Sequence, residues 1–476
     1  MTGPAAARRP LDQARGYRAY VLAMLVLLYT SNFIDRTILG VLGQSIKEDL
    51  RLSDAQLGLL GGLAFAVLYS TLGVPVARLA ERHPRTGVIS AALAVWSAMT
   101  AACALAGGFW QLMAARIGVG IGEAGCIPPA NSLLADYFPP EKRATAAGVF
   151  SLGIPLGALL GAILGGLIAQ TWGWRAAFAL VGLPGVALAG LFRLTVREPP
   201  RGAFDAALPE SAPPLAAVAA SLARKPAFLH LAFAAALAAF AGYGVQTFAV
   251  PFLLRGFQVT LLQASLVFGL FGALSAGVGV VAGGAIADRA ARKDRRWYVL
   301  IPAAGFVLAA PLYMLAFLQR DLLWLGVLVI PPAVLQYLYF GPLYATTTNM
   351  VGPRSRATAA ALLTLVINLI GLGLGPTVIG WASDQFATHA YTGLIPYARA
   401  CPGGLPPPGA TGFAASGCRT ASFVGLQHAL VLSATIYLWA GLHLVLAART
   451  LRRDLEAWAD PARLDMAGPP RASARP

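Results

Sequence analysis

The chain has 476 residues, of which 57% are hydrophobic and only 12% are charged, and its mean hydropathy is +0.67. Soluble globular proteins carry about 25% charged residues, so this composition excludes a soluble enzyme, a disordered scaffold and a collagen-like fibre. Its 4 cysteines are too few for a disulfide-stapled secreted module. The net charge of +16 suggests membrane topology before it suggests nucleic acid, since cytoplasmic loops collect Lys and Arg.

Apolar runs of about 20 residues, long enough to cross a bilayer as a helix, recur along nearly the whole chain. Six predicted spans lie at 18–42, 55–79, 86–107, 109–135, 143–170 and 172–195. Six more lie at 226–255, 261–287, 297–318, 322–350, 356–383 and 421–448. The sequence therefore predicts an all-α polytopic membrane protein, with an N-terminal bundle at 1–195, a central loop at 196–224, a C-terminal bundle at 225–450 and a tail at 451–476.

The distribution of basic residues predicts the orientation. If both termini and the central loop are cytoplasmic, most of the 36 Lys and Arg residues fall on the cytoplasmic side. This excess predicts a multi-pass protein of a cell membrane, such as the bacterial inner membrane, with both ends inside. It also accounts for most of the net charge, so a nucleic-acid partner is not expected.

Two patterns occur once in each half. Residues 284–293, with Asp288, Arg289 and Arg292, correspond to residues 77–86, with Glu81, Arg82 and Arg85. Arg143-Ala-Thr-Ala-Ala147 reappears as Arg356-Ala-Thr-Ala-Ala360. Nearly equal offsets at two separate places indicate a duplicated six-helix half, the construction of transporters that rock about a central site.

With these repeats the chain resembles the major facilitator superfamily. Residues 284–293 match the Gly-x-x-x-Asp-Arg-x-x-Arg-Lys loop of that family, whereas the first copy has Ala77 and Glu81 in place of Gly and Asp. The resemblance implies a twelve-helix fold of two pseudo-symmetric bundles, without a cofactor and without enzymatic activity.

Two further motifs are similar to those of spinster-type transporters. They are Asn32-Phe-Ile-Asp35-Arg36 in the first span, and Arg116-Ile-Gly-Val-Gly120-Ile-Gly-Glu123 in the fourth, with Asp136 and Arg143 downstream. Relatives of this type export sphingosine-1-phosphate or lysophospholipids, so the resemblance implies an amphiphilic lipid as substrate.

Four charges are embedded deep in the predicted spans: Asp35, Arg36, Arg116 and Glu123. Each costs roughly 2.5–3.5 kcal/mol at the bilayer centre, so they are retained only if they pair or line water. Arg116 and Glu123 are two turns apart and share a helix face, whereas Asp35 and Arg36 point about 100° apart. We expect Asp35 and Glu123 to carry protons, although a neutral quartet that only pins the two helices together is the alternative.

The predicted substrate site combines these charges with polar and aromatic residues of both halves. Either Arg36 or Arg116 is expected to bind an anionic head group, because a guanidinium forms a bidentate fork to phosphate. The alternative makes Arg116 only the partner of Glu123. The other predicted binding residues are Asn32, Tyr243, Gln246, Tyr344 and Asn368.

The repeated loops predict a cytoplasmic gate. Asp288 is expected near Arg143, and Glu81 near Arg356, so that each carboxylate faces the start of a helix in the other half. The gate set is completed by Arg82, Arg85, Arg289 and Arg292. These latches are expected to hold the cytoplasmic side shut.

Several local features predict structure rather than chemistry. Glycines 153, 157, 161 and 165 recur every four residues, a spacing that lets another helix approach closely. Pro128 and Pro129 predict a kink after Glu123. Cys401 and Cys418 share a predicted outer loop and are candidates for a disulfide. Leu451, Leu455 and Trp458 predict a tail helix lying on the cytoplasmic leaflet.

The sequence predicts a proton-coupled secondary transporter of lysophospholipid-like or sphingosine-phosphate-like amphiphiles, working as a monomer among membrane lipids. A multidrug exporter, an organic-anion symporter on the same fold, and a non-transporting membrane receptor are the alternatives. No metal-ligand spacing and no phosphate-binding Gly-Lys-Ser loop occurs, so neither a metal nor direct ATP drive is expected.

Overall fold

The computed structural model describes residues 15–201, 203–204, 213–352 and 355–456. Within these ranges the chain is helical and contains no strand. The elements of the N-terminal half are α1 (Arg15–Leu50), α2 (Asp54–Gly61), α3 (Leu63–Arg82), α4 (Arg85–Cys103), α5 (Phe109–Glu123), α6 (Ile127–Tyr137), α7 (Pro140–Ser151) and α8 (Gly153–Thr195).

The second half follows the helix α9 (Leu215–Ala223) of the central loop. Its elements are α10 (Pro226–Gly256), α11 (Leu261–Ala291), α12 (Trp297–Phe317), α13 (Leu322–Tyr337), α14 (Phe340–Asn349), α15 (Arg356–Val366), the π-helix η3 (Ile367–Leu374), α16 (Gly375–Ala390), α17 (Tyr397–Ala400), the 3₁₀ turn η4 (Pro402–Gly404) and α18 (Gly412–Glu456).

Each of the twelve predicted spans corresponds to helix, but several are broken into shorter helices. The fourth span is α5 and α6, interrupted directly after Glu123, where Pro128 and Pro129 begin α6. Proline lacks an N–H group, so it fits the first turn of a helix and ends the one before it. The predicted kink is therefore confirmed. The fifth and sixth spans both lie within the element α8, which is kinked at Gly173, where the φ of 83° and ψ of 166° are not helical and suit glycine.

The glycine stripe of α8 packs against α1. A Cβ added at Gly157 would lie 2.5 Å from the Phe33 Cβ, and one at Gly161 would lie 3.1 Å from the Ile34 Cα. Gly153 and Gly165 face Tyr29 and Ile38 in the same way. The predicted close approach is confirmed, and it holds the helix that carries Asp35 and Arg36 firmly to its own half.

The end of α18 packs differently from the expected surface helix. Leu451 and Leu455 are buried in the apolar core of the C-terminal half, and Asp454 Oδ2 accepts a 2.9 Å hydrogen bond from the Ala227 N–H at the start of α10. Because this stripe faces the protein, it is not available to the leaflet. Trp458 lies outside the described residues.

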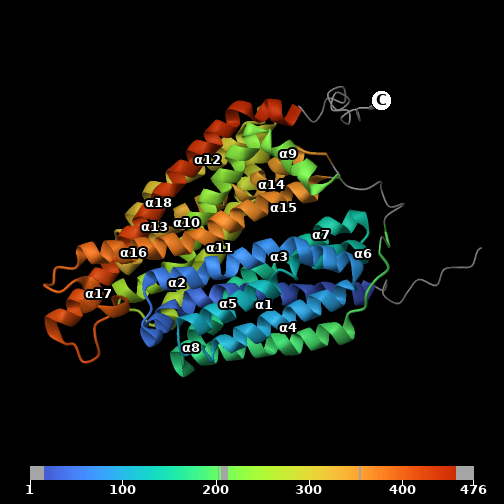
Figure 1. Ribbon diagram of the computed structural model, residues 1–476. Helices are drawn as coiled ribbons and strands as arrows, with labels where there is room; N and C mark the ends of the chain where they lie inside the picture. The colour runs from blue at the N-terminus through green and yellow to red at the C-terminus, as the bar shows by residue number, and fades with distance from the viewer. Residues whose placement is uncertain (1–14, 202, 205–212, 353–354, 457–476) are drawn as a thin grey trace, which may run out of the picture.

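The two halves form two bundles of roughly parallel helices that lie side by side (Figure 1). Among the described residues, every hydrogen bond between the halves involves residues 44–58 or Gln170 of the N-terminal half. We call this end of the molecule, with the 391–411 loop, the closed end. The start of α1 and the end of α18 lie at the opposite end (Figure 1).

Candidate functional site: a charged cavity and the closed end

Arg36 of α1 binds Glu123 at the end of α5. The Arg36 Nε lies 2.8 Å from the Glu123 Oε2, and the Glu123 side chain is fully buried, whereas that of Arg36 is 16% exposed. The guanidinium also lies over the rings of Phe33, Phe65 and Tyr69, at 5.3, 5.1 and 4.5 Å from their centroids. A carboxylate and three aromatic faces thus hold this cation inside the N-terminal half.

Among the residues that the structure describes, no carboxylate forms an ion pair with Arg116. Its Nε and Nη1 atoms are buried without a hydrogen-bond partner, and its guanidinium lies 5.6 Å from the centroid of Phe65. Glu123 shares the helix face of Arg116, as the spacing predicted, but hydrogen-bonds to Arg36 instead. The alternative in which Arg116 serves only as the partner of Glu123 therefore does not describe this arrangement.

Asp35 points away from Arg36, as the 100° rotation between neighbouring helical residues predicted. It is 1% exposed and its Oδ1 has no hydrogen-bond partner. Trp96 and Thr100 of α4 lie beside it, and the charges of Glu123 and Arg116 act on it. An unpartnered polar atom in a buried site costs about 1–3 kcal/mol, so the Asp35 Oδ1 lowers the stability of this arrangement.

A cavity lies between the halves next to these charges. Four of the seven predicted binding residues line it, namely Arg36, Arg116, Tyr243 and Gln246, together with Phe33, Thr37, Leu39, Gly40, Gly61, Phe65, Thr247 and Leu372. Its N-terminal wall thus carries two guanidinium groups. Its C-terminal wall, from α10 and η3, is uncharged and combines the aromatic Tyr243 and the apolar Leu372 with the polar Gln246 and Thr247.

The other three predicted binding residues do not line this cavity. Asn32 is buried behind it, with both side-chain polar atoms unpartnered. The Tyr344 hydroxyl lies 3.1 Å from the Thr364 hydroxyl, which joins α14 to α15. Asn368 is buried within η3.

The closed end contains a buried cluster of charges that the sequence did not predict. Asp54, the first residue of α2, accepts hydrogen bonds from Lys47 of α1 at 2.8 Å, from Arg255 of α10 at 2.7 and 2.7 Å, and from Ser383 of α16 at 2.6 Å. Lys47 is 0% exposed and Asp54 is 2% exposed. Two of the three partners belong to the C-terminal half, so the cluster ties the halves together.

Asp384 of α16 adds a second link of the same kind. Its carboxylate accepts hydrogen bonds from the backbone N–H groups of Asp54 and Ala55, at 3.1 and 2.8 Å. These N–H groups belong to the first turn of α2, where the positive end of the helix dipole favours an anion. One half therefore caps a helix of the other. We predicted this geometry for the cytoplasmic gate, and the structure has it at the opposite end.

Asp288 and Arg143, the first predicted pair of the cytoplasmic gate, each form hydrogen bonds within their own half in this conformation. Asp288 accepts a 3.0 Å hydrogen bond from the Tyr298 hydroxyl, and the Arg143 Nε donates to the carbonyls of Ala135 and Phe138. The remaining exposed members of the set are Glu81, Arg82, Arg289, Arg292 and Arg356. The two latches stay a prediction for the state in which this end is closed.

Arg85 is the buried member of the gate set. It is 1% exposed, donates to Asp136, and donates from its Nε to Glu198 at 2.7 Å. All of these residues belong to the N-terminal half or directly follow it. Arg85 therefore fastens the start of α4 to the end of α6 and to the segment after α8.

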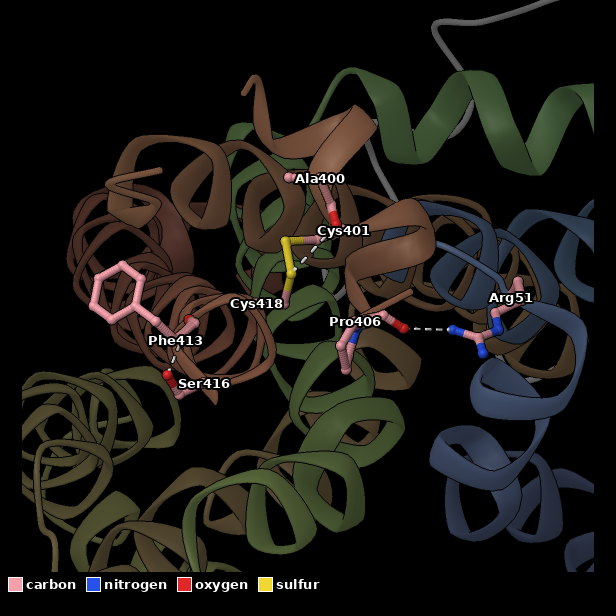
Figure 2. Close-up of a disulfide and its surroundings, with 7 residues drawn as sticks. All are labelled: Arg51, Ala400, Cys401, Pro406, Phe413, Ser416 and Cys418. Carbon is pink, nitrogen blue, oxygen red and sulfur yellow. Dashed lines mark hydrogen bonds between the residues drawn. A yellow bond between two sulfur atoms is a disulfide. The ribbon is translucent and has the colours of Figure 1, made fainter. Parts of the chain in front are cut away.

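The candidate disulfide is confirmed. Cys401 and Cys418 are bonded, which links the loop after α16 to the first turns of α18 (Figure 2). Cys103 and Cys126 are free and buried in the N-terminal half.

Comparisons with known proteins identify the family to which this chain belongs. The sequence model of the Major Facilitator Superfamily matches residues 25–376. An MFS-type efflux pump of Mycolicibacterium smegmatis is 34% identical over 364 residues, which cover 76% of this chain and 84% of that protein. The chain therefore belongs to the Major Facilitator Superfamily, and it is a multi-pass membrane transporter rather than an enzyme.

The resemblance to spinster-type proteins is confirmed as well. Human protein spinster homolog 1 is 30% identical over 396 residues, covering 78% of this chain and 74% of that protein. A solved bacterial homolog of the human lysosomal transporter spinster, in an inward-facing and occupied conformation, superposes with a TM-score of 0.84. It is 35% identical, and the match covers 93% of this chain and 99% of that one.

Proposed function

We propose that this chain is a proton-coupled transporter of anionic amphiphiles, lysophospholipid-like or sphingosine-phosphate-like. The observation that carries the proposal is Arg116, a buried guanidinium with two unpartnered nitrogen atoms on the wall of the cavity. Buried arginine donors are costly when unpaired and form strong paired hydrogen bonds to phosphate oxygens. The facing wall, with Tyr243 and Leu372, offers apolar and aromatic surface for an acyl chain.

We propose further that the closed end faces the outside. Both ends of the chain are then cytoplasmic, which agrees with the distribution of Lys and Arg. In this orientation the conformation is inward-facing, like that of the solved spinster homolog. Transport then requires the halves to rock, so that the Asp54 cluster opens and the cytoplasmic latches close.

Asp35 and Glu123 are the proposed proton carriers. With Asp35, Arg36, Arg116 and Glu123 all ionised the site is neutral, and protonating one carboxylate leaves a charge of +1. This surplus attracts an anion, so electrostatics alone favours symport. Antiport requires the proton and substrate to compete, for instance through a head-group amine or through different conformations. We propose export by antiport, in line with the spinster resemblance.

The test is uptake of a lysophospholipid panel by proteoliposomes under an imposed pH gradient. Arg116→Lys keeps the charge but removes the bidentate fork, so uptake of phosphorylated substrates is expected to fall about tenfold or more. Arg175→Lys is the matched control, because Arg175 is 44% exposed and pairs with Asp49 on the surface. Full uptake by the Arg116→Lys protein would refute direct recognition of the head group.

Proton coupling has its own test. Asp35→Asn and Glu123→Gln are each expected to flatten the pH dependence of the inward–outward equilibrium, measured with spin-label distances. If both single variants and the double variant respond to pH like the parent, other residues carry the proton.

The efflux pump among the relatives supports one alternative, export of hydrophobic drugs through the same cavity. Competition separates the two: a neutral drug that is transported independently of Arg116, and that lysophospholipid does not inhibit, favours the alternative. A receptor that binds without transport would show binding of the lipid but no uptake.

A further inference from the structure

The 391–411 loop, between α16 and α18, is folded rather than extended, and a disulfide links it to α18. It contains α17 and η4, and Cys401 within it is bonded to Cys418 of α18. Both cysteines are 1% exposed and pack with Tyr397 and Ala421 in a small apolar cluster. Because both ends of the loop and its disulfide belong to the C-terminal half, the loop must move with that half as one body.

This loop reaches across to the N-terminal half at the turn between α1 and α2. The Arg51 Nη1 donates a 2.9 Å hydrogen bond to the Pro406 carbonyl, and Figure 2 shows the Arg51 side chain extending from the turn after α1 toward the loop. Arg51 has a φ of 53°, in the left-handed region that non-glycine residues rarely adopt. The turn thus holds a strained conformation at the point of contact.

The closest contact is between two backbones. A Cβ added at Gly403 would lie 2.5 Å from the Arg51 carbonyl oxygen and 2.8 Å from the Arg51 carbonyl carbon. No side chain fits there without moving one half away from the other. Gly403 has a φ of 63°, so glycine suits this position for its conformation as well as for the space.

The same loop covers the buried charge cluster. A Cβ at Gly404 would lie 3.2 Å from the Lys47 Nζ and 3.1 Å from the Tyr397 hydroxyl. Burial, together with the Asp54 and Asp384 carboxylates, raises the pKa of the Tyr397 phenol, which keeps this group neutral over the cluster. Excluding water strengthens the ion pairs below, since Coulomb energies grow as the local dielectric constant falls.

We propose that residues 391–411 are a disulfide-linked lid that holds the closed end shut by seating Gly403 on the Arg51–Leu52 turn and Gly404 over Lys47. The contact exists only while the halves meet at this end. Each rocking movement must therefore break and remake it, and its strength sets how readily this end opens. The lid rests on the proposed function only in requiring that the halves rock.

The test compares two glycines of the lid in the full-length protein in lipid nanodiscs. Gly403→Ala places a methyl group against the Arg51 backbone. Gly409→Ala is the matched control, because Gly409 also has a positive φ, 79°, but no atom lies within 4 Å of its added Cβ. Spin labels at L105C and R320C, on exposed positions of opposite halves, report the width of this end.

The open population is expected to rise about tenfold in the Gly403→Ala protein and to stay at the parent value in the Gly409→Ala protein, since forcing an atom against fixed backbone is costly. Equal distance distributions in these two variants and the parent would overturn the proposal.

If the Gly403→Ala protein does not fold, the Arg51→Gly variant tests the same contact. It keeps the turn and removes the hydrogen bond to Pro406, and it is expected to raise the open population several-fold. An Arg51→Gly protein and a Cys401→Ser/Cys418→Ser protein that both match the parent would likewise overturn it. None of these distances requires substrate, so a failure of lysolipid uptake leaves this test intact.

Discussion

Replacing Asp54 by Asn is the sharpest test of how the closed end is held. Its carboxylate accepts four hydrogen bonds, from Lys47, Ser383 and both terminal nitrogens of Arg255, and all of them lie in a buried site. An Asn side chain is uncharged and offers one acceptor oxygen instead of two. The variant therefore leaves two buried cations without their counter-ion.

The size of the effect follows from which contacts cross between the halves. Lys47 and Asp54 belong to the same half, so their pair persists when this end opens, whereas the contacts with Arg255 and Ser383 are lost. Removing one partner of a buried ion pair costs roughly 3–5 kcal/mol. Taking the lower value, and about 1.4 kcal/mol for each factor of ten, we expect the open population to grow at least about 100-fold.

The measurement is again the distance between labels at L105C and R320C. Asp49→Asn is the control, because Asp49 pairs with Arg175 at 2.6 Å within one half, and both side chains are 44% exposed. Such surface pairs contribute about 0–1 kcal/mol, and this one does not cross between halves. An Asp54→Asn protein whose distances match those of the parent and of the control would refute the reasoning.

Three further outcomes are expected. Gly157→Ala should lower the melting temperature by crowding α1, at a cost of about 1–3 kcal/mol. Gly190→Ala, in the part of α8 beyond the kink at Gly173, should not, because no atom lies within 4 Å of the added Cβ; equal melting temperatures would contradict the packing argument. Asp288→Asn should shift the population toward the inward-facing state, and Glu81→Gln should do so less, because each substitution weakens a latch of the outward-facing state. Unchanged distances in both variants between spin labels at the end opposite the closed end would argue against the latches. Burial raises the pKa of Tyr397, so the closed end should weaken as the pH rises past about 10, where the exposed phenol ionises first. Tyr397→Phe should lack this alkaline opening, and an identical pH response in that variant would rule out the phenol as its cause.

The sequence predicted the helices well because hydropathy is a local property. Each of the twelve predicted ranges is helical in the structure, and the kink after Glu123 followed from the backbone chemistry of Pro128 and Pro129. The π-helix at 367–374 was not predicted, since no residue type in Ile367–Leu374 demands five-residue hydrogen bonding. The burial of Leu451 was also missed, because an amphipathic stripe looks the same whether it faces lipid or protein.

The site was predicted only in part, because its pairings depend on how helices are rotated against one another. The four embedded charges were evident from their cost in a membrane, but the choice of Arg36 rather than Arg116 as the partner of Glu123 was not. The cluster around Asp54 was missed entirely. Lys47 lies beyond the predicted span 18–42 and Arg255 is the last residue of the predicted span 226–255, positions where charges are ordinary. Only the folded chain brings these distant segments together.

The composition of the closed end bears on how a membrane voltage can act on this transporter. The N-terminal half contributes Lys47 and Asp54 to the cluster, and the C-terminal half contributes Arg255 and Asp384. With all four ionised, each half's share is electrically neutral. A voltage of 100 mV acts with about 2.3 kcal/mol on each elementary charge that crosses the field, but separating two neutral shares moves no net charge. The electric field would therefore act on any charged species that crosses through the cavity, and leave the opening of this end to be set by contacts alone.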